Sequence, residues 1–337
     1  MKVSVKKISE ITGFSQATVS NALNRKKGVN QKTAEIILEE AQKLGYFSDN
    51  HITRVKFVLY KQSGRIVEDT PYFPLLISGV EQECRANGLD MTICNLDRRE
   101  ADFHEQLLQI QQDALCGVIL VGTELTEHDA DLIAGMQCPY VLIDYWDDEL
   151  NLNSIMINNA DSARRATGYL IKKGHREIGY LCGDFRIVPF QQRHSGYRSA
   201  LRRNGLPYRE EYVIRLGTTM DSAYQDMKMY LLKKPQLPTA FFADNDMIAL
   251  GAMKALLDMG IRIPEDVSIV GFDDLSYSSI AATPLTTLRV PKQEMGRIAV
   301  KRLLDLIGGN RSGYTKIQVC TEFIERSSVC EVQEGNR

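Results

Sequence analysis

Apolar positions recur at helical spacing three times within the first fifty residues. Ser4 can cap a first helix that Gly13 closes, and Ser15 can cap a second over QATVSNALN. Asn30 can cap a third helix that Gly45 stops. The residues that would face inward are Val5, Ile8 and Ile11; Val19, Ala22 and Leu23; and Ala34, Ile37, Leu38, Ala41 and Leu44. A helix, a short glycine-containing turn and a second short helix predict a helix-turn-helix.

The second helix leaves short hydrogen-bonding and methyl-sized side chains outside, which suit base edges and phosphates in a major groove. We assign DNA contact to Ser15, Gln16, Ala17, Thr18, Ser20, Asn21 and Asn24. Gln16 and Asn21 suit adenine edges, and Ala17 suits a thymine methyl; the hydroxyls suit phosphates. Taken singly, each polar residue is better explained as a solvated helix position. The three-helix arrangement, together with a basic charge balance, favours DNA.

From Val55 onward the pattern changes to short apolar runs separated by helix-length segments. The runs are VKFVLY, MTICN, GVILVG, YVLID, IGYLCG, TAFFAD and VSIVGF. Runs this apolar are typical of parallel strands covered by helices on both faces. Two sets, divided near residues 154–162, predict an α/β body of two doubly wound parallel-sheet lobes. The late segment LTTLRVPKQEMGRIAVKRLLDLI and a β-like stretch to Arg326 should cross back between them.

These patterns predict three parts. The helix-turn-helix head covers residues 1–48, a short linker 49–54, and the two-lobed body 55–337. Within the body we expect an N lobe over about 55–157 plus 289–316, and a C lobe over about 158–288 plus 317–330.

Polar side chains stand where the predicted strands of the body end. Asp144 follows YVLI, Asn245 follows FFAD, and Asp273 follows SIVGF; Arg193 opens the helix after IGYLCG and its loop. Ligands of doubly wound sheets bind outside the carboxyl ends of the strands. Carboxylates and amides accept or bridge adjacent hydroxyls, and a guanidinium donates in a rigid fork. The set therefore predicts a sugar-like ligand between the lobes.

Three aromatic residues could add apolar surface to that site. Tyr72 and Phe73 are expected in the loop after the first strand, and Trp146 lies just past Asp144. Simpler explanations stand beside each assignment. An aspartate at a strand end usually caps the next helix, Arg193 could form a surface ion pair, and the aromatic rings could pack the lobe.

Charge and cysteine content narrow the class of protein. Residues 1–56 hold ten Lys and Arg against five acids, so this segment is +5 and the remainder of the −2 chain is −7. Seven scattered cysteines, never spaced C-x-x-C, favour reduced thiols over a disulfide frame or zinc site. No apolar run approaches membrane-spanning length, and the N-terminus lacks a signal-like segment, so we expect a cytoplasmic protein without membrane, metal or cofactor.

The N-terminal segment VSVKKISEITGFSQATVSNALNRKKGVNQKTAEIILEEAQKLGY resembles the signature of the LacI/GalR repressor family, notably S-x-A-T-V-S-x-x-L-N and the closing L-G-Y. The resemblance implies that the helix after Ser15 enters the major groove, with Gln16 and Ala17 selecting the operator. The family usually has an arginine where this chain has Asn21, which leaves open the base contacted there.

The linker departs from the family pattern. Relatives place a hinge helix after L-G-Y whose leucine wedges into the minor groove and bends the duplex. Here only FSDNHITR separates Tyr46 from the first strand, room for at most about two helical turns. Ile52 is the single aliphatic candidate for the wedge. We therefore expect weaker operator bending than in typical relatives, or none.

Three C-terminal blocks extend the resemblance to nearly the whole chain: QQRHSGYRSAL, FFADNDMIALGAMKAL and PEDVSIVGFDDLSYSSIAATPLTTLRVP. In the family the corresponding arginine, asparagine and aspartate contact the effector, which implies that role for Arg193, Asn245 and Asp273. Asp144 matches a pocket position less strictly. After Arg326 no heptad-rich tail remains, so we expect a homodimer rather than a tetramer built on a coiled coil.

These observations favour a DNA-binding regulator, most simply a repressor, controlled by a sugar-like effector. Enzyme signatures are absent: there is no G-x-G-x-x-G, G-x-x-x-x-G-K-[ST], G-x-S-x-G or H-E-x-x-H. An exported sugar-binding protein of the same fold would need a signal peptide in place of the basic head. A co-repressor-type regulator that responds to a purine or a phosphocarrier protein is the remaining alternative.

Overall fold

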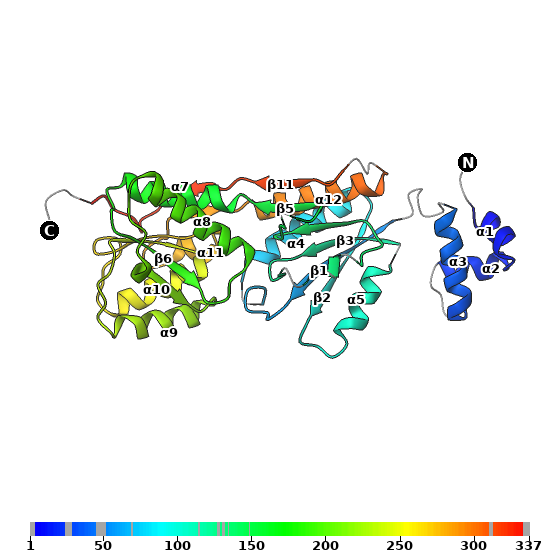
Figure 1. Cartoon of the computed structure of the whole chain (residues 1–337), viewed down its shortest axis with the longest axis horizontal. Coiled ribbons are helices and arrows are strands. Elements are labelled where there is room, and N and C mark those ends of the chain that lie inside the picture. Colours follow the sequence, from blue (N-terminus) through cyan, green and yellow to red (C-terminus); the bar gives the residue numbers. More distant parts are fainter. Residues whose placement is uncertain are drawn as a thin grey trace.

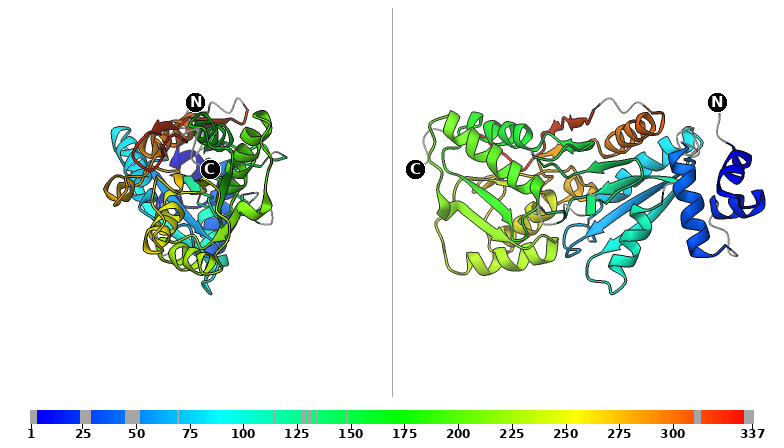
Figure 2. Two further views of the ribbon diagram at one scale, coloured as in Figure 1. Left: turned by 90° about the vertical axis from the view of Figure 1, so that its left-hand side faces the viewer. Right: turned by 45° about the vertical axis from the view of Figure 1, so that its right-hand side comes forward.

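The computed structural model describes residues 4–23, 29–44, 52–68, 70–113, 115–126, 129, 132–133, 135–147, 149–309 and 313–332. A helical head and two α/β lobes follow one another along the long axis of the molecule (Figures 1 and 2). Both lobes are built on parallel sheets, so the predicted fold class is confirmed.

The head consists of α1 (Val5–Thr12), α2 (Gln16–Leu23) and α3 (Gln31–Lys43). The Ser4 hydroxyl accepts the Lys7 N–H, and Gly13 ends α1 in the left-handed conformation with φ 74°. Ser15 begins α2 in the same way, because its hydroxyl accepts the Thr18 N–H at 3.1 Å. A small apolar core joins the three helices: Ile8, Val19, Ala22, Leu23, Ile37 and Ala41. The predicted helices are confirmed, and so are their inward faces except at Ile11, which is 44% exposed and lies outside this core.

The N lobe contains a six-stranded parallel sheet in the order β11-β5-β4-β3-β1-β2. The strands are β1 (Arg54–Lys61), β2 (Asp90–Asp97), β3 (Cys116–Val121), β4 (Tyr140–Ile143), β5 (Ser154–Ile157) and β11 (Lys316–Val319). Successive strand residues point to opposite faces, so Phe57 packs toward α4 (Tyr72–Ala86) and α12 (Lys292–Ile307), and Val58 toward α5 (Phe103–Gln111).

Two glycines let α4 and α12 approach backbone to backbone. A Cβ added at Gly79 would lie 2.1 Å from the Gln293 carbonyl oxygen, and one at Gly296 would lie 2.7 Å from the Leu76 carbonyl oxygen. No side chain larger than hydrogen fits at those separations. This contact sets the position of α4, whose first turn faces the other lobe.

The C lobe has a four-stranded parallel sheet in the order β7-β6-β8-β9. Its strands are β6 (Ile178–Gly183), β7 (Val213–Leu216), β8 (Ala240–Ala243) and β9 (Ser268–Val270). One face is covered by α7 (Asn159–Lys172) and α8 (Val188–Arg203), and the other by α9 (Met220–Leu231) and α10 (Asp246–Asp258). A short 3-10 helix, η3 (Glu210–Tyr212), precedes β7.

The late segment crosses between the lobes as predicted, but residues 317–319, expected in the C lobe, belong to the N-lobe sheet. After α11 (Ser276–Ile280), β10 (Thr287–Arg289) leads into α12 of the N lobe, and β11 joins the N-lobe sheet beside β5. The chain then returns through β12 (Glu322–Ile324), which pairs with β10 in antiparallel fashion. In Figure 1 these red and orange crossing segments run along one side of the molecule.

Candidate functional site

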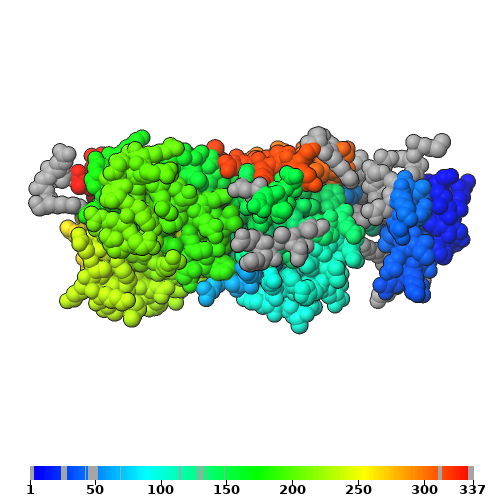
Figure 3. Space-filling view, viewed as in Figure 1, coloured from blue at the N-terminus to red at the C-terminus, as the bar shows by residue number. Residues whose placement is uncertain are grey.

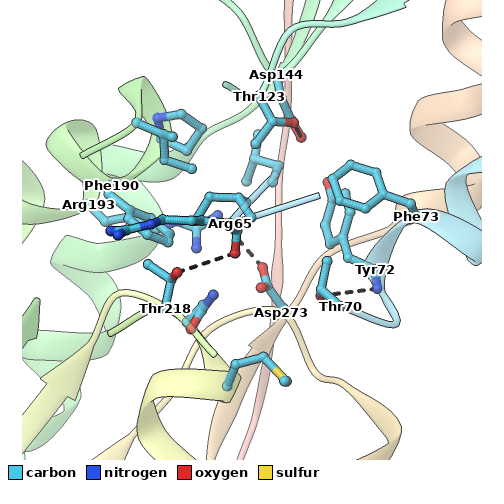
Figure 4. Close-up of a pocket in the computed structure, with 16 residues that line it drawn as sticks. Arg65, Thr70, Tyr72, Phe73, Thr123, Asp144, Phe190, Arg193, Thr218 and Asp273 are labelled. Atoms are coloured by element: carbon cyan, nitrogen blue, oxygen red, sulfur yellow. Dashed lines mark hydrogen bonds and ion pairs between the residues drawn. The ribbon is translucent and has the colours of Figure 1, made fainter. Parts of the chain in front are cut away.

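A cavity lies between the two lobes, beyond the carboxyl ends of their strands (Figure 4). Six of the seven predicted ligand residues line it: Tyr72, Phe73, Asp144, Arg193, Asn245 and Asp273. They come from five separate segments, and the fold brings them to one place. Trp146 is the exception. It does not line the cavity, and its ring lies beneath the Lys316 ammonium, 5.2 Å from the centroid.

Asp144 stands directly after β4 in a backbone conformation that non-glycine residues rarely adopt, with φ 61°. Its side chain is only 3% exposed. The Thr123 hydroxyl donates to Oδ2 at 3.3 Å, and Oδ1 has no hydrogen-bond partner. Burial raises the pKa of this carboxyl to about 6, against the opposing charge of Arg193. The result is a strained, under-bonded acceptor that faces the cavity.

Asp273 repeats this arrangement on the C lobe. It follows β9 with φ 117°, and its Oδ1 also lacks a hydrogen bond. The nearest guanidinium nitrogen of Arg193 lies 3.6 Å from Oδ1. Burial raises the pKa of Asp273, while Arg193 and Lys292 oppose the shift. The Lys292 ammonium also donates to the Asp273 backbone carbonyl and so holds the loop from behind.

Arg193 is fixed from three sides. Its Nε donates to Asn159 at 2.9 Å, Nη1 donates to the Asp244 carbonyl at 2.6 Å, and the guanidinium lies 3.6 Å from the Phe272 ring centroid. The other end of the fork is left to face Asp273 and the cavity. Since α8 begins at Val188, the expectation that Arg193 opens this helix is wrong. It lies in the second turn, where helix packing buries it.

Asn245 has a structural task as well as a place in the cavity wall. Its side-chain oxygen accepts the Ile248 N–H at 3.0 Å and caps α10. The carbonyl oxygen is therefore already bonded, and the amide N–H₂ is the part that can serve a ligand.

Tyr72 and Phe73 were expected in a loop, and this is wrong: they form the first turn of α4. Their rings pack edge to face at 5.2 Å, and both are almost fully buried. A helical first turn holds them more rigidly than a loop would. The structure adds wall residues that sequence reasoning missed: Arg65, Ile66, Thr123, Phe190, Thr218 and Met247. None of them carries a motif, so no pattern marked them.

Most of the predicted DNA-contacting residues lie on α2 or at its N-cap. Ser15, Gln16 and Ala17 are exposed at the start of α2, while Thr18, Ser20 and Asn21 are half-buried. The Ser15 hydroxyl lies 2.8 Å from that of Thr18. Asn24 and residues 49–51 of the linker lie outside the described residues. Ile52 lies among the described residues, two positions before β1, and its side chain is half-buried.

Two features were searched for among the residues that the structure describes: a membrane-spanning helix and a metal site. The described residues contain no helix long and apolar enough to span a membrane. They also contain no group of three or more His, Cys, Asp or Glu side chains that could hold a metal ion.

A recognition helix on a basic head, joined to two lobes that enclose a polar cavity, is the architecture of a ligand-controlled transcription regulator.

Comparison with known proteins identifies the family. The chain is 32% identical over 331 residues to the HTH-type transcriptional repressor PurR of Haemophilus influenzae strain PittEE, with 96% of this chain and 98% of that protein covered. PurR of Pasteurella multocida strain Pm70 is 29% identical over a similar span. Residues 167–329 match the periplasmic binding protein-like domain. The chain belongs to the LacI/GalR family of transcription regulators, and its relatives are regulators, not enzymes.

Solved structures agree with the fold. A complex of the transcriptional regulator CelR with cellobiose matches with a TM-score of 0.74 at 27% identity, covering 97% of this chain and all of that one. The lac repressor dimer bound to operator and the anti-inducer ONPF matches with a TM-score of 0.72 at 22% identity, covering 98% of this chain and all of that one. At the latter identity the likeness concerns the fold alone.

Proposed function

We propose that this protein is a homodimeric, sequence-specific repressor whose operator affinity is controlled by a small sugar or sugar derivative bound between the lobes. The observation that carries the proposal is the pair of buried carboxylate oxygens, Asp144 Oδ1 and Asp273 Oδ1, that lack hydrogen-bond donors. A buried acceptor without a hydrogen bond costs free energy that a ligand hydroxyl recovers on binding. An anionic ligand would instead meet two buried carboxylates and, among the residues that line the cavity, one buried guanidinium, that of Arg193.

The mechanism follows from where these groups stand. Asp144 belongs to the N lobe, while Arg193, Asn245 and Asp273 belong to the C lobe. A polyol that bonds both sets favours the arrangement in which the lobes are close. In a dimer this changes the separation of the two heads, and each α2 must fit one half-site about one helical turn from the other. The effector changes operator affinity only by its differential affinity for the two arrangements.

A second candidate effector is a purine that acts as a co-repressor. It is favoured by the 32% identity to repressors named PurR over almost the whole chain. A purine N–H could also satisfy Asp144 or Asp273, and its ring could stack on Tyr72 or Phe190 in the cavity wall. A ring offers fewer donors than a polyol, which is why the sugar is our first choice.

A thermal-shift panel separates the two candidates, because a ligand raises the melting temperature with its occupancy. The panel holds D-ribose, D-glucose, D-galactose, cellobiose, guanine and hypoxanthine, each with the wild type, Asp273→Asn and the control Asp258→Asn. Asp258 is a surface carboxylate on α10 that pairs with Lys254. We expect a sugar to stabilise the wild type and the control but not Asp273→Asn. Stabilisation by purines alone would replace the proposal by the second candidate.

A further inference from the structure

The loop between β1 and α4 wraps its backbone around a single buried carboxylate. The N–H groups of Gln62, Ser63 and Gly64 donate to Glu124 Oε2 at 2.8 to 2.9 Å. The Ile66 N–H donates to Oε1 at 2.8 Å, and the Val67 N–H reaches the same oxygen at 3.4 Å. We name residues 62–68 the clasp loop.

Glu124 is only 1% exposed, so its charge needs compensation inside the protein. The converging N–H groups supply it, as backbone nests do for bound anions. Gly64, at φ 76°, takes the left-handed conformation at the centre of the turn. The shape of the clasp loop is therefore dictated by this one side chain of the N lobe.

Side chains of the N lobe fasten the clasp loop from outside as well. Arg99 donates to the Ser63 carbonyl at 2.8 Å and pairs with Glu68 at 2.6 Å. Lys61, the last residue of β1, reaches the same Glu68 carboxylate at 3.3 Å. A loop held at both ends and at its centre acts as a rigid extension of the N lobe.

The tip of the clasp loop contacts the C lobe in three ways. The Arg65 guanidinium pairs with Asp184, directly after β6, at 3.0 Å. The Thr218 hydroxyl donates to the Arg65 carbonyl at 3.3 Å (Figure 4). Ile66 packs against the C-lobe core cluster that contains Leu181 and Phe190. In Figure 3 the blue surface of the segment after β1 touches the C lobe on the side opposite the crossing segments.

We propose that the clasp loop is an interlobe closure element, in which Glu124 is the positioning residue and Arg65 with Ile66 hold the lobes together over the effector cavity. Arg65 and Ile66 also line that cavity, so the clasp loop both forms part of the cavity wall and connects the two lobes. The segments that cross between the lobes, from β10 to α12 and from β11 to β12, act as the hinge on the side opposite the clasp loop. The inference rests on the proposed function for its biological meaning, since it concerns regulation of the same site. The closure itself needs no ligand.

Lobe closure is measured in the ligand-free full-length protein by energy transfer between two dyes. Leu108 on α5 and Gln225 on α9 are exposed. Both helices lie on the side of the molecule away from the hinge (Figure 1). p-Acetylphenylalanine at both positions accepts the dyes and leaves the seven cysteines untouched. Opening about the hinge lengthens the distance between the dyes. Fluorescence of Trp146, the single tryptophan, checks that each variant is folded.

The variants separate the latch from general stability. Arg65→Ala and Glu124→Gln should lengthen the mean distance between the dyes, and Arg65→Asp should do the same. Because the Arg65–Asp184 pair is about half exposed, we expect Arg65→Ala to shift the open-to-closed ratio about two- to fivefold. Arg262→Ala, the matched control, removes an arginine whose Asp266 partner lies in the same lobe, and should change nothing.

Charge reversal provides the decisive arm. Arg65→Asp combined with Asp184→Arg should restore the wild-type distance, which a merely structural effect on the loop would not do. The proposal is overturned if Arg65→Ala and folded Glu124→Gln both leave the distance unchanged, or if the double reversal recovers nothing. Failure of every sugar and purine to bind would contradict the proposed function. The distances between the dyes in the ligand-free protein test the clasp loop independently of that result.

Discussion

Effector binding should strengthen as the pH rises from 5 to 7, and Asp144 should be the cause. Burial raises the pKa of its carboxyl to about 6 in the ligand-free protein. A ligand that donates a hydrogen bond to Oδ1 prefers the ionised form of Asp144. A protonated Asp144 must therefore lose its proton when the ligand binds. Affinity is therefore low below pH 6 and reaches its plateau above it.

The magnitude follows from the titration. With a pKa of about 6, roughly a tenth of Asp144 is ionised at pH 5 and roughly nine tenths at pH 7. The dissociation constant should then be about tenfold larger at pH 5 than at pH 7. Asp273, whose pKa is also raised by burial, adds to the slope in the same direction. His194 does not contribute in this window, because burial lowers its pKa to about 4.

Isothermal titration of the best sugar from the panel at pH 5, 6 and 7 measures the slope, and Asp144→Asn is the matched variant. The amide cannot ionise, so the variant should bind weakly with a smaller pH dependence. Stability should change with the opposite sign. A raised carboxyl pKa stabilises the ligand-free fold at low pH, and this is lost as the pH rises through about 6; the difference from the ordinary value of 3.8 corresponds to about 3 kcal/mol. A wild-type affinity that is flat from pH 5 to 7 would refute the reasoning.

Four further predictions test the assignments separately. Exchanging Gln16 and Ala17 for other residues should change the operator preferred in a binding-site selection. The binding free energy should change by about 1–3 kcal/mol per altered base pair, and an identical preference would show that the two residues do not contact bases. Asp273→Asn should weaken effector binding about 10- to 100-fold while gel-shift affinity for the operator stays the same; unchanged induction would remove Asp273 from the site. Gly79→Ala should lower the free energy of unfolding by about 1–3 kcal/mol, because its Cβ would lie 2.1 Å from a carbonyl oxygen of α12. Gly168→Ala, on α7 with open space around its Cβ, should instead raise it by about 0.5–1 kcal/mol in urea denaturation.

The architecture and the main polar groups of the cavity could be predicted because both follow from local patterns. The alternation of apolar runs with helix-length segments gave the two sheets, and the rule that ligands bind beyond strand ends gave Asp144 and Asp273. The same rule misplaced Trp146. It stands only two residues after Asp144, but the strained backbone at Asp144 turns the chain, and the Trp146 ring meets Lys316 of β11 instead of the cavity. A φ of 61° at an aspartate leaves no mark in the sequence.

The clasp loop was beyond reach for a different reason. Its shape depends on Glu124, which lies 57 to 62 positions along the chain from the N–H groups that it accepts. A lone glutamate after GVILVGT looks like any solvated residue, because nothing local shows that five backbone donors will surround it. Its buried charge has meaning only once β1 and β3 lie side by side in the sheet. Sequence patterns therefore predict which elements form and where ligands bind, while the contacts that couple one lobe to the other emerge only from the packed chain.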